Sequence, residues 1–265
     1  MNLRLTFKSL LKGWISFPFL GLLLIPILSQ LTEAKPNSDA ICKKPKIGTY
    51  IIASQGSKQN IPIGQLQLET WNSDGTLTGT RFLREGRSYN ENFYTGKWKN
   101  IKNCTISVSR SEIGWDSSVI LQSNGNPHFG IISTPGIVAS ELWFPQSKKS
   151  CTKDTIVGTV LSVQVGHQLK DGKWLPDRVI QREQWNSWRM SGVAIASYSG
   201  KFEAATYQGK FTQTNNCIGS IRQQDAYGMT YNYIAILLSN GKGYVYLQTQ
   251  DDALTLAVLE HSKIK

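Results

Sequence analysis

Apolar and aromatic residues fall into short runs along the chain, and small polar residues separate the runs. The runs are five to ten residues long and rich in Val, Ile, Thr and aromatic side chains, with Gly, Asn, Asp and Ser between them. Such runs, bounded by turn residues, are typical of β-strands. Beyond residue 34 no stretch shows a helical period with capping residues at its ends. The pattern therefore predicts an all-β protein.

Eight strands are predicted in each half of the chain. In the first half they span residues 47–54, 64–71, 77–85, 91–100, 105–111, 117–123, 128–134 and 137–144. In the second half they span residues 155–165, 177–185, 191–198, 202–213, 218–224, 231–239, 243–249 and 254–260. Short turns between successive strands favour an antiparallel up-and-down barrel, because closure leaves no exposed edge. A β-sandwich is the alternative, but it usually needs a long crossover, which we do not find.

The two halves repeat each other in sequence. The segment YTGKWKNIKNC, residues 94–104, returns as YQGKFTQTNNC at residues 207–217. Three shorter matches accompany it in the same order, namely IGTY with VGTV, two copies of WNS and two copies of SNG. Their offsets lie between 110 and 116 residues, as expected when loops differ slightly in length between two homologous domains.

The repeat sets the expected domain boundaries and pairs the four cysteines. Each domain has one cysteine at its start and one at the end of the repeated segment. Four cysteines allow three pairings, and the symmetry favours Cys42 with Cys104 and Cys151 with Cys217. The predicted segments are a signal peptide at 1–34, a first domain at 41–145, a linker at 146–150 and a second domain at 151–261.

The N-terminal segment has the three-part layout of a secretory signal. A cationic head precedes an apolar run at residues 15–28, and Thr32 and Ala34 lie where a signal peptidase requires small residues. The apolar run is shorter than the roughly 20 residues that span a bilayer. We therefore expect cleavage near Ala34, export to the periplasm or the cell exterior, and no stable membrane anchor. Disulfides fit such an oxidising compartment.

The chain is basic, with 29 Lys and Arg against 18 Asp and Glu and a net charge of +11. Removal of three cations and one anion with the leader leaves +9. The cations are scattered, which favours a generally basic surface, with an anionic glycan or the cell envelope as the alternative partner. No nucleic-acid-binding motif accompanies the charge, so we expect no nucleic-acid partner. The sequence does not indicate an oligomeric state.

Two short motifs resemble known exported barrels. Gly48-Thr49-Tyr50, near the first strand, resembles the opening of a lipocalin. The repeated Y-x-G-K-[WF]…N-C resembles the strand–turn signature of small bacterial barrels of the lipocalin-like (calycin) or allene-oxide-cyclase/dirigent-like type. In the second domain Val160 stands where Tyr50 would recur. The resemblance implies barrel-shaped domains and carries no function.

Motifs for catalysis, metal binding and cofactor binding are absent from the sequence. It contains no G-x-S-x-G, H-E-x-x-H, phosphate-binding loop or dinucleotide fingerprint, and no C-x-x-C pair. The three histidines have no counterparts in the other repeat, so we expect neither a metal site nor a cofactor. Glu69 and Glu183 resemble a carboxylate pair for glycoside chemistry, but they belong to different domains.

The aromatic residues of the repeat are the candidates for a ligand site. On each repeated strand two large aromatic side chains flank a glycine on one face, and each glutamate noted above shares a strand face with a tryptophan. Such rings can form a core or line a pocket for a hydrophobic ligand or a sugar. The candidate ligand-binding residues are Tyr94, Trp98, Tyr207, Phe211, Trp71 and Trp185.

Three functions fit these features. The favoured one is an exported binding protein that carries or sequesters a small apolar or amphipathic ligand. The first alternative is a structural or adhesive envelope protein that contacts an anionic glycan or another protein. The second alternative is a dirigent-like or cyclase-like barrel enzyme, whose catalysis needs few recognisable motifs. The sequence leans away from an enzyme.

Overall fold

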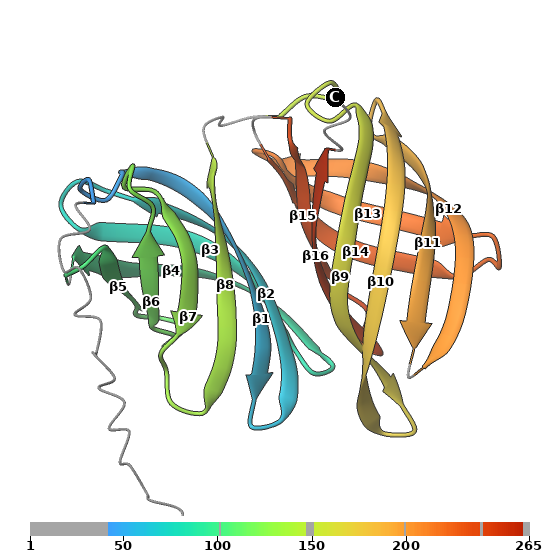
Figure 1. Ribbon diagram of the computed structural model, residues 1–265, viewed down its shortest axis with the longest axis horizontal. Coiled ribbons are helices and arrows are strands. Elements are labelled where there is room, and N and C mark those ends of the chain that lie inside the picture. Colours follow the sequence, from blue (N-terminus) through green and yellow to red (C-terminus); the bar gives the residue numbers. More distant parts are fainter. Residues whose placement is uncertain (1–41, 101, 147–150, 199, 239–240, 262–265) are drawn as a thin grey trace, which may run out of the picture. The chain divides into compact units, whose positions relative to one another are not determined.

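The protein forms two closed antiparallel β-barrels of eight strands each, which appear in sequence order in Figure 1. The computed structural model describes residues 42–100, 102–146, 151–198, 200–238 and 241–261. Every regular element among them is a strand, so these residues contain no helix that could cross a membrane. The predicted all-β class and the two homologous barrels are confirmed, and the sandwich alternative is wrong. The predicted signal peptide at 1–34 and most of the predicted linker, residues 147–150, lie outside the described residues.

Each strand pairs with its neighbour in sequence, and the last strand of each set pairs with the first to close the barrel. The first barrel comprises β1 (Gly48–Lys58), β2 (Ile61–Trp71), β3 (Thr76–Glu85), β4 (Ser88–Asn100), β5 (Thr105–Arg110), β6 (Ser117–Leu121), β7 (Pro127–Ile132) and β8 (Ile137–Gln146). The second comprises β9 (Gly158–Lys170), β10 (Lys173–Asn186), β11 (Arg189–Tyr198), β12 (Lys201–Asn215), β13 (Ile218–Asp225), β14 (Thr230–Leu237), β15 (Gly243–Gln248) and β16 (Ala253–His261).

Alternation of side chains explains why these segments are barrel strands. Along β8 and β9 nearly every second residue is buried and those between are exposed, as a strand with one face in a core requires. The turns have the matching chemistry. Asp171 and Gly172 join β9 to β10 with φ of 50° and 74°, which suits the type I′ turn preferred in two-residue hairpins.

The repeated segment is a strand that ends in a left-handed turn at a disulfide. Asn103 and Cys104 have φ of 49° and 64°, and Asn216 and Cys217 have 34° and 75°. Asparagine tolerates this region, whereas cysteine seldom adopts it. In both barrels the cysteine of this turn is bonded to the cysteine that precedes the first strand. The two predicted disulfides are present, with Cα atoms 5.4 and 4.8 Å apart.

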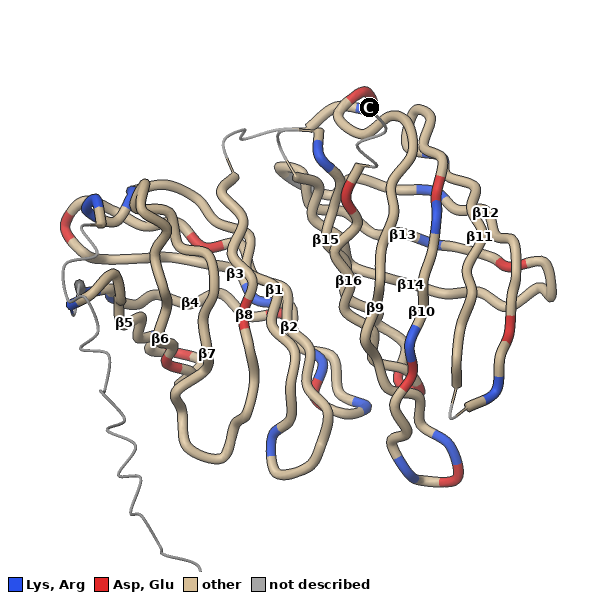
Figure 2. The backbone as a smooth tube through the Cα atoms, viewed as in Figure 1, with Lys and Arg blue, Asp and Glu red and all other residues tan. Residues whose placement is uncertain are grey.

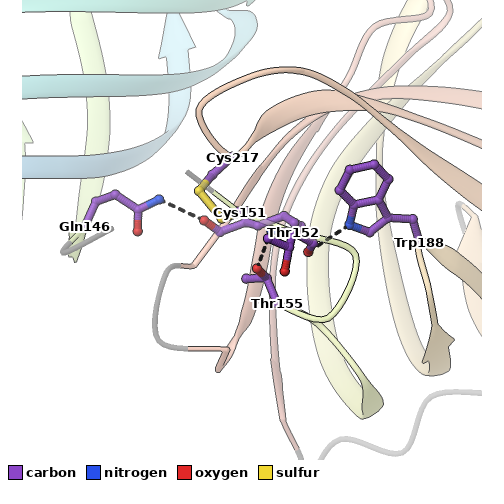
Figure 3. The surroundings of a disulfide bond; sticks show 7 residues. Gln146, Cys151, Thr152, Thr155, Trp188 and Cys217 are labelled. Carbon is purple, nitrogen blue, oxygen red and sulfur yellow. Dashed lines mark hydrogen bonds between the residues drawn. A yellow bond between two sulfur atoms is a disulfide. The ribbon is translucent and has the colours of Figure 1, made fainter. Parts of the chain in front are cut away.

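The second disulfide anchors the segment that leads into the second barrel (Figure 3). Thr152 donates its backbone N–H to Thr155 Oγ1 at 2.8 Å, and the Trp188 indole donates to the Thr152 carbonyl at 3.1 Å. Thr155 N–H also bonds back to the Thr152 carbonyl, which forms a turn. Because of this turn β9 begins at Gly158, whereas the sequence predicted a strand from residue 155.

Candidate functional site

The lumen of the first barrel is filled by side chains around a buried ion network. Arg110 Nε lies 2.6 Å from Glu69 Oε2, and Arg110 Nη1 donates to Ser117 Oγ at 2.7 Å. Ser117 donates in turn to Glu141 Oε1 at 2.8 Å. All three charged side chains are fully buried. The tryptophans that follow each glutamate by two residues, Trp71 and Trp143, donate their indole N–H groups to these carboxylates.

Electrostatic attraction within this network favours the charged form of Arg110. Burial by itself lowers the pKa of Arg110, but attraction by Glu69 and Glu141 outweighs it and raises the pKa above its ordinary value. Burial raises the pKa of Glu141, and the charge of Arg110 opposes that rise. A buried ion pair of this kind is expensive to break, because the remaining partner is left uncompensated. The ion network and the aromatic residues around it thus form a packed core at the centre of the first barrel.

The second barrel replaces the ion network with a single carboxylate, Glu183. Its Oε1 accepts hydrogen bonds from Gln181, Tyr207 and Gln223 at 3.1, 2.9 and 3.1 Å. Its Oε2 accepts from Trp185 at 2.8 Å and Tyr244 at 2.6 Å. We call Glu183 and these five donors the floor network. Burial raises the pKa of Glu183, and the hydrogen bonds from Tyr244, Trp185, Tyr207 and Gln223 oppose the rise.

Above the floor network the second barrel is hollow. The cavity has a volume of about 520 Å³, which falls within the range of small-molecule sites. The rim includes Tyr227 and Met229 of the β13–β14 turn, which are 75% and 60% exposed, so the cavity opens to solvent at this end. The wall is contributed by the inward-facing residues of the second barrel's strands, with tyrosines, glutamines and charged groups among small alanines. The lining includes Gln164, Asp177, Ala194, Ala196, Tyr198, Glu203, Tyr207, Gln223, Asp225, Tyr231, Tyr233 and Gln248.

Small residues on β11 account for part of the hollow. Gly79 of β3 pairs with Tyr94, and Gly192 of β11 pairs with Tyr207, so these glycines align the two strands residue by residue. Four residues beyond Gly79 stands Leu83, which packs in the apolar cluster that closes the first lumen. The corresponding residue beyond Gly192 is Ala196. Likewise Ala194 stands where Arg81 stands in the first barrel, so two long side chains are missing from this wall.

Beside Glu183 the second barrel differs from the first at several residues, but the lumen at that end is filled in both barrels. The sixth residue after the repeated cysteine is Arg110 in the first barrel and Gln223 in the second. Gly130 pairs with Glu141 across β7 and β8, and a Cβ on Gly130 would lie 2.6 Å from the Glu141 carboxylate. In the second barrel the matching pair places a tyrosine opposite an alanine. This pair is Tyr246 and Ala257.

Asp177 is the unusual group in the cavity wall. It is 3% exposed, yet its Oδ1 has no hydrogen-bond partner. Gly166 pairs with it on β9, and a side chain at Gly166 would collide with the Asp177 carboxyl. Burial raises the pKa of Asp177 from 3.8 to about 6, and the neighbouring Arg178 opposes the shift. The matching position of the first barrel is Ile63, which lies eight residues before Trp71 as Asp177 lies eight residues before Trp185.

Tyrosines surround the same space. Tyr233 lies against Tyr246 with ring centres 4.4 Å apart, and thus extends the packed aromatic core up to the cavity. Tyr231 donates to Asp225 Oδ2 at 3.1 Å. Burial raises the pKa of Tyr198 to about 12, and the charge of Asp177 adds to that rise. Tyr198 also pairs directly with Asp177 across β10 and β11. The phenols therefore stay neutral and act as hydrogen-bonding and aromatic surfaces.

Charges around the cavity differ in sign from those of the chain as a whole. The lining contains four acidic residues and two lysines, although the chain carries +11. Asp225 is satisfied by Tyr231 and by the backbone N–H groups of Tyr227 and Met229. Elsewhere Lys and Arg are dispersed along the strands and turns of both barrels (Figure 2). Among the described residues no cluster of three or more His, Cys, Asp or Glu could hold a metal.

The structure places the six candidate aromatic residues in different surroundings. Tyr207 lines the cavity and donates to Glu183. The remaining five do not line it. They lie in or against the packed cores, and are Tyr94, Trp71 and Trp98 in the first barrel and Phe211 and Trp185 in the second. Glu69 and Glu183 lie in separate lumens, each bonded to its own tryptophan, so they form no catalytic pair.

Reasoning from the sequence missed Asp177, Tyr198, Tyr231 and the alanines of β11. One signal was available. When the two repeats are aligned, Ile63 corresponds to Asp177, and Leu83 corresponds to Ala196. The residues that differ between the repeats, rather than those of the shared motif, therefore indicate the position of the cavity.

Comparisons with known proteins identify no relative by sequence. No family model matches the chain, and no curated protein matches it. Among solved structures, kievitone hydratase from Nectria haematococca matches with a TM-score of 0.31 and 7% identity, covering 87% of this chain and 95% of that one. A porin-like protein from Bacteroides uniformis matches with a TM-score of 0.24 and 8% identity, covering 83% and 98%. TM-scores this low carry no argument, and the resemblance to lipocalin-like or dirigent-like barrels stays a prediction.

Proposed function

We propose that this protein is an exported binding protein whose second barrel holds one small amphipathic ligand, while the first barrel is a packed structural domain. The observation that carries the proposal is the half-hollow lumen above Glu183, with a volume of about 520 Å³ and an exposed rim. The two disulfides support an oxidising, exported environment. Export itself rests on the signal-like N-terminus.

The composition of the wall favours an amphipathic ligand over a purely apolar one. Tyrosine rings and alanine methyl groups provide apolar surface, while glutamine amides and carboxylates project into the same space. Ligand pockets combine apolar lining with a few convergent polar groups, which orient the ligand. A fully apolar ligand would leave these polar groups without water or a partner, which is unfavourable.

Two variants test the site directly. The neutral fluorophore N-phenyl-1-naphthylamine serves as the probe, and its fluorescence rises when it leaves water. We expect saturable binding by the disulfide-intact protein and at least tenfold weaker binding by Ala196→Leu, which installs the residue that stands at Leu83 in the first barrel. Leu83→Ala is the matched control and should leave binding unchanged. Absence of saturable binding, or equal binding by Ala196→Leu, would refute the proposal.

The enzymatic alternative uses the same cavity. Its support is Asp177, whose pKa of about 6 lies near the pH at which a general acid or base operates well. Binding and catalysis differ in the fate of the bound compound, which mass spectrometry after incubation measures. The adhesive alternative has less support, because the Lys and Arg positions are spread along the strands and turns of both barrels (Figure 2).

A further inference from the structure

We propose that the ligand of the second barrel is an organic cation, with an ammonium group beside Asp177 and an apolar or aromatic body against the tyrosines. This inference rests on the proposed function and names its ligand class. It follows from three features of the cavity wall: an unpartnered carboxyl, a set of aromatic rings, and an excess of acidic groups. The carboxyl is absent from the corresponding part of the first barrel, where Ile63 stands in place of Asp177.

The unpartnered carboxyl gives the position of the cation. Asp177 lines the cavity but is only 3% exposed, and its Oδ1 has no hydrogen-bond partner. A buried carboxylate without a donor is costly. The fold does not require an acid there, since Ile63 fills the matching position of the first barrel. Glu183 is different, because five donors already satisfy it. An ammonium group would supply the donor and the countercharge that Asp177 lacks.

The tyrosine rings suit the remainder of such a ligand. Tyr198 pairs with Asp177 across the hairpin, and Tyr231 and Tyr233 face the same cavity. Aromatic faces attract cations, and the attraction strengthens where water is excluded. The same faces offer contact area for an aromatic or aliphatic body. In the first barrel the position of Tyr198, which pairs with Ile63, is occupied by Glu85.

The sign of the charge excludes an anion as the better ligand. The cavity is lined by Asp177, Glu203, Asp225 and Asp252 against Lys170 and Lys201. Both lysines are exposed at the ends of their strands, where solvent screens them. A carboxylate or phosphate placed deeper would meet Asp177 and Glu183 without a buried cation. A negative cavity on a basic chain also attracts cations locally while the rest of the surface repels them.

A panel of matched probes tests the inference. Three bodies of increasing size, phenyl, indolyl and carbazolyl, each carry an ethylamine, the neutral N-acetyl derivative of that amine, or a propionate. Isothermal titration calorimetry at pH 7.5 measures their affinity for the disulfide-intact protein. We expect at least one amine to bind at least tenfold more tightly than its neutral and anionic partners.

Asp177→Asn, which keeps the shape and removes the charge, should abolish this preference and leave the neutral probe within twofold. Asp171→Asn is the matched control. It removes the same charge from the exposed β9–β10 turn, at a left-handed φ of 50° that asparagine tolerates. It should keep the preference. Tyr198→Leu should weaken the binding of the amine several-fold and reduce the affinity for the neutral derivative by a smaller factor.

The outcomes separate this inference from the proposed function. If neutral probes bind as well as amines, or if Asp177→Asn keeps the preference for the amine, the organic-cation inference is wrong and the binding cavity remains. If no probe binds and N-phenyl-1-naphthylamine fails as well, both are wrong. Tighter binding of the propionates would overturn the charge argument in particular.

Discussion

Asp177→Asn is expected to make the protein more stable at neutral pH while impairing the binding site. The pKa of Asp177 rises from 3.8 to about 6 on folding because the carboxyl is buried without a donor. One pKa unit corresponds to 1.36 kcal/mol, so the ionised carboxylate destabilises the fold by about 3 kcal/mol at pH 7. Asparagine has nearly the same shape and no charge, so the variant should regain about that amount.

The sign of the pH dependence follows from linkage. Between pH 3.8 and about 6 the folded state holds the Asp177 proton more tightly than the unfolded state does. Stability contributed by this group is therefore full below pH 3.8 and is lost as the pH rises through 6. The advantage of Asp177→Asn should accordingly be greatest at pH 7 and above and should vanish near pH 3.5, where the aspartate is protonated in both states.

Urea-induced unfolding between pH 3.5 and 8 measures this difference, with disulfides intact. Hydrogen exchange of peptides from β9 to β16 assigns the transition to the second barrel, because two domains need not unfold together. Asp171→Asn serves as the control and should stay within about 0.5 kcal/mol of the wild type. An advantage that is absent at pH 7, or that persists unchanged to pH 3.5, would show that Asp177 has a partner or is well solvated, and the reasoning would fail.

Three further predictions concern the packing of the two barrels and the second disulfide. Arg110→Gln should destabilise the first barrel by about 3 to 5 kcal/mol, because two buried carboxylates lose their cation. Adding Glu141→Ala and Gly130→Tyr, which reproduces the residues of the second barrel, should recover much of this loss in the same urea assay. Gly192→Ala should cost about 1 to 3 kcal/mol by overpacking, since the new Cβ would lie 2.7 Å from the Tyr207 ring and the Arg182 carbonyl; unchanged stability would contradict that geometry. Replacing both cysteines of the Cys151–Cys217 bridge by alanine should lower stability by about 2 to 4 kcal/mol, measured by thermal unfolding; a loss confined to the first barrel would contradict the assignment.

Local chemistry was sufficient for much of the architecture. Strand positions follow from runs of β-forming residues between turn residues, and the Asp171-Gly172 turn has the dihedral angles that this pair of residues favours. The repeat predicted two equivalent domains and the correct disulfides, because homologous segments occupy equivalent places. Strand order was predictable too, since short turns can join only neighbouring antiparallel strands.

The candidate site depends on which side chains meet across the lumen, and the sequence alone did not reveal that. The shared motif drew notice to Tyr94 and Trp98, yet Tyr94 lies in the packed core and Trp98 packs against it. The cavity arises from residues that differ between the repeats and come from many strands. A small Ala196 creates space only because no neighbouring strand fills it, and Asp177 lacks a partner only because none of its neighbours reaches it.

The sequence by itself thus determined the strands, the turns, the duplication and the disulfide pairs, because each depends on residues close in sequence or related by the repeat. Tertiary structure decided that one lumen is packed around Arg110 and the other is hollow above Glu183. The physical reason is that a closed barrel brings inward-facing residues from eight strands to one axis, where their combined volume and charge determine whether space remains.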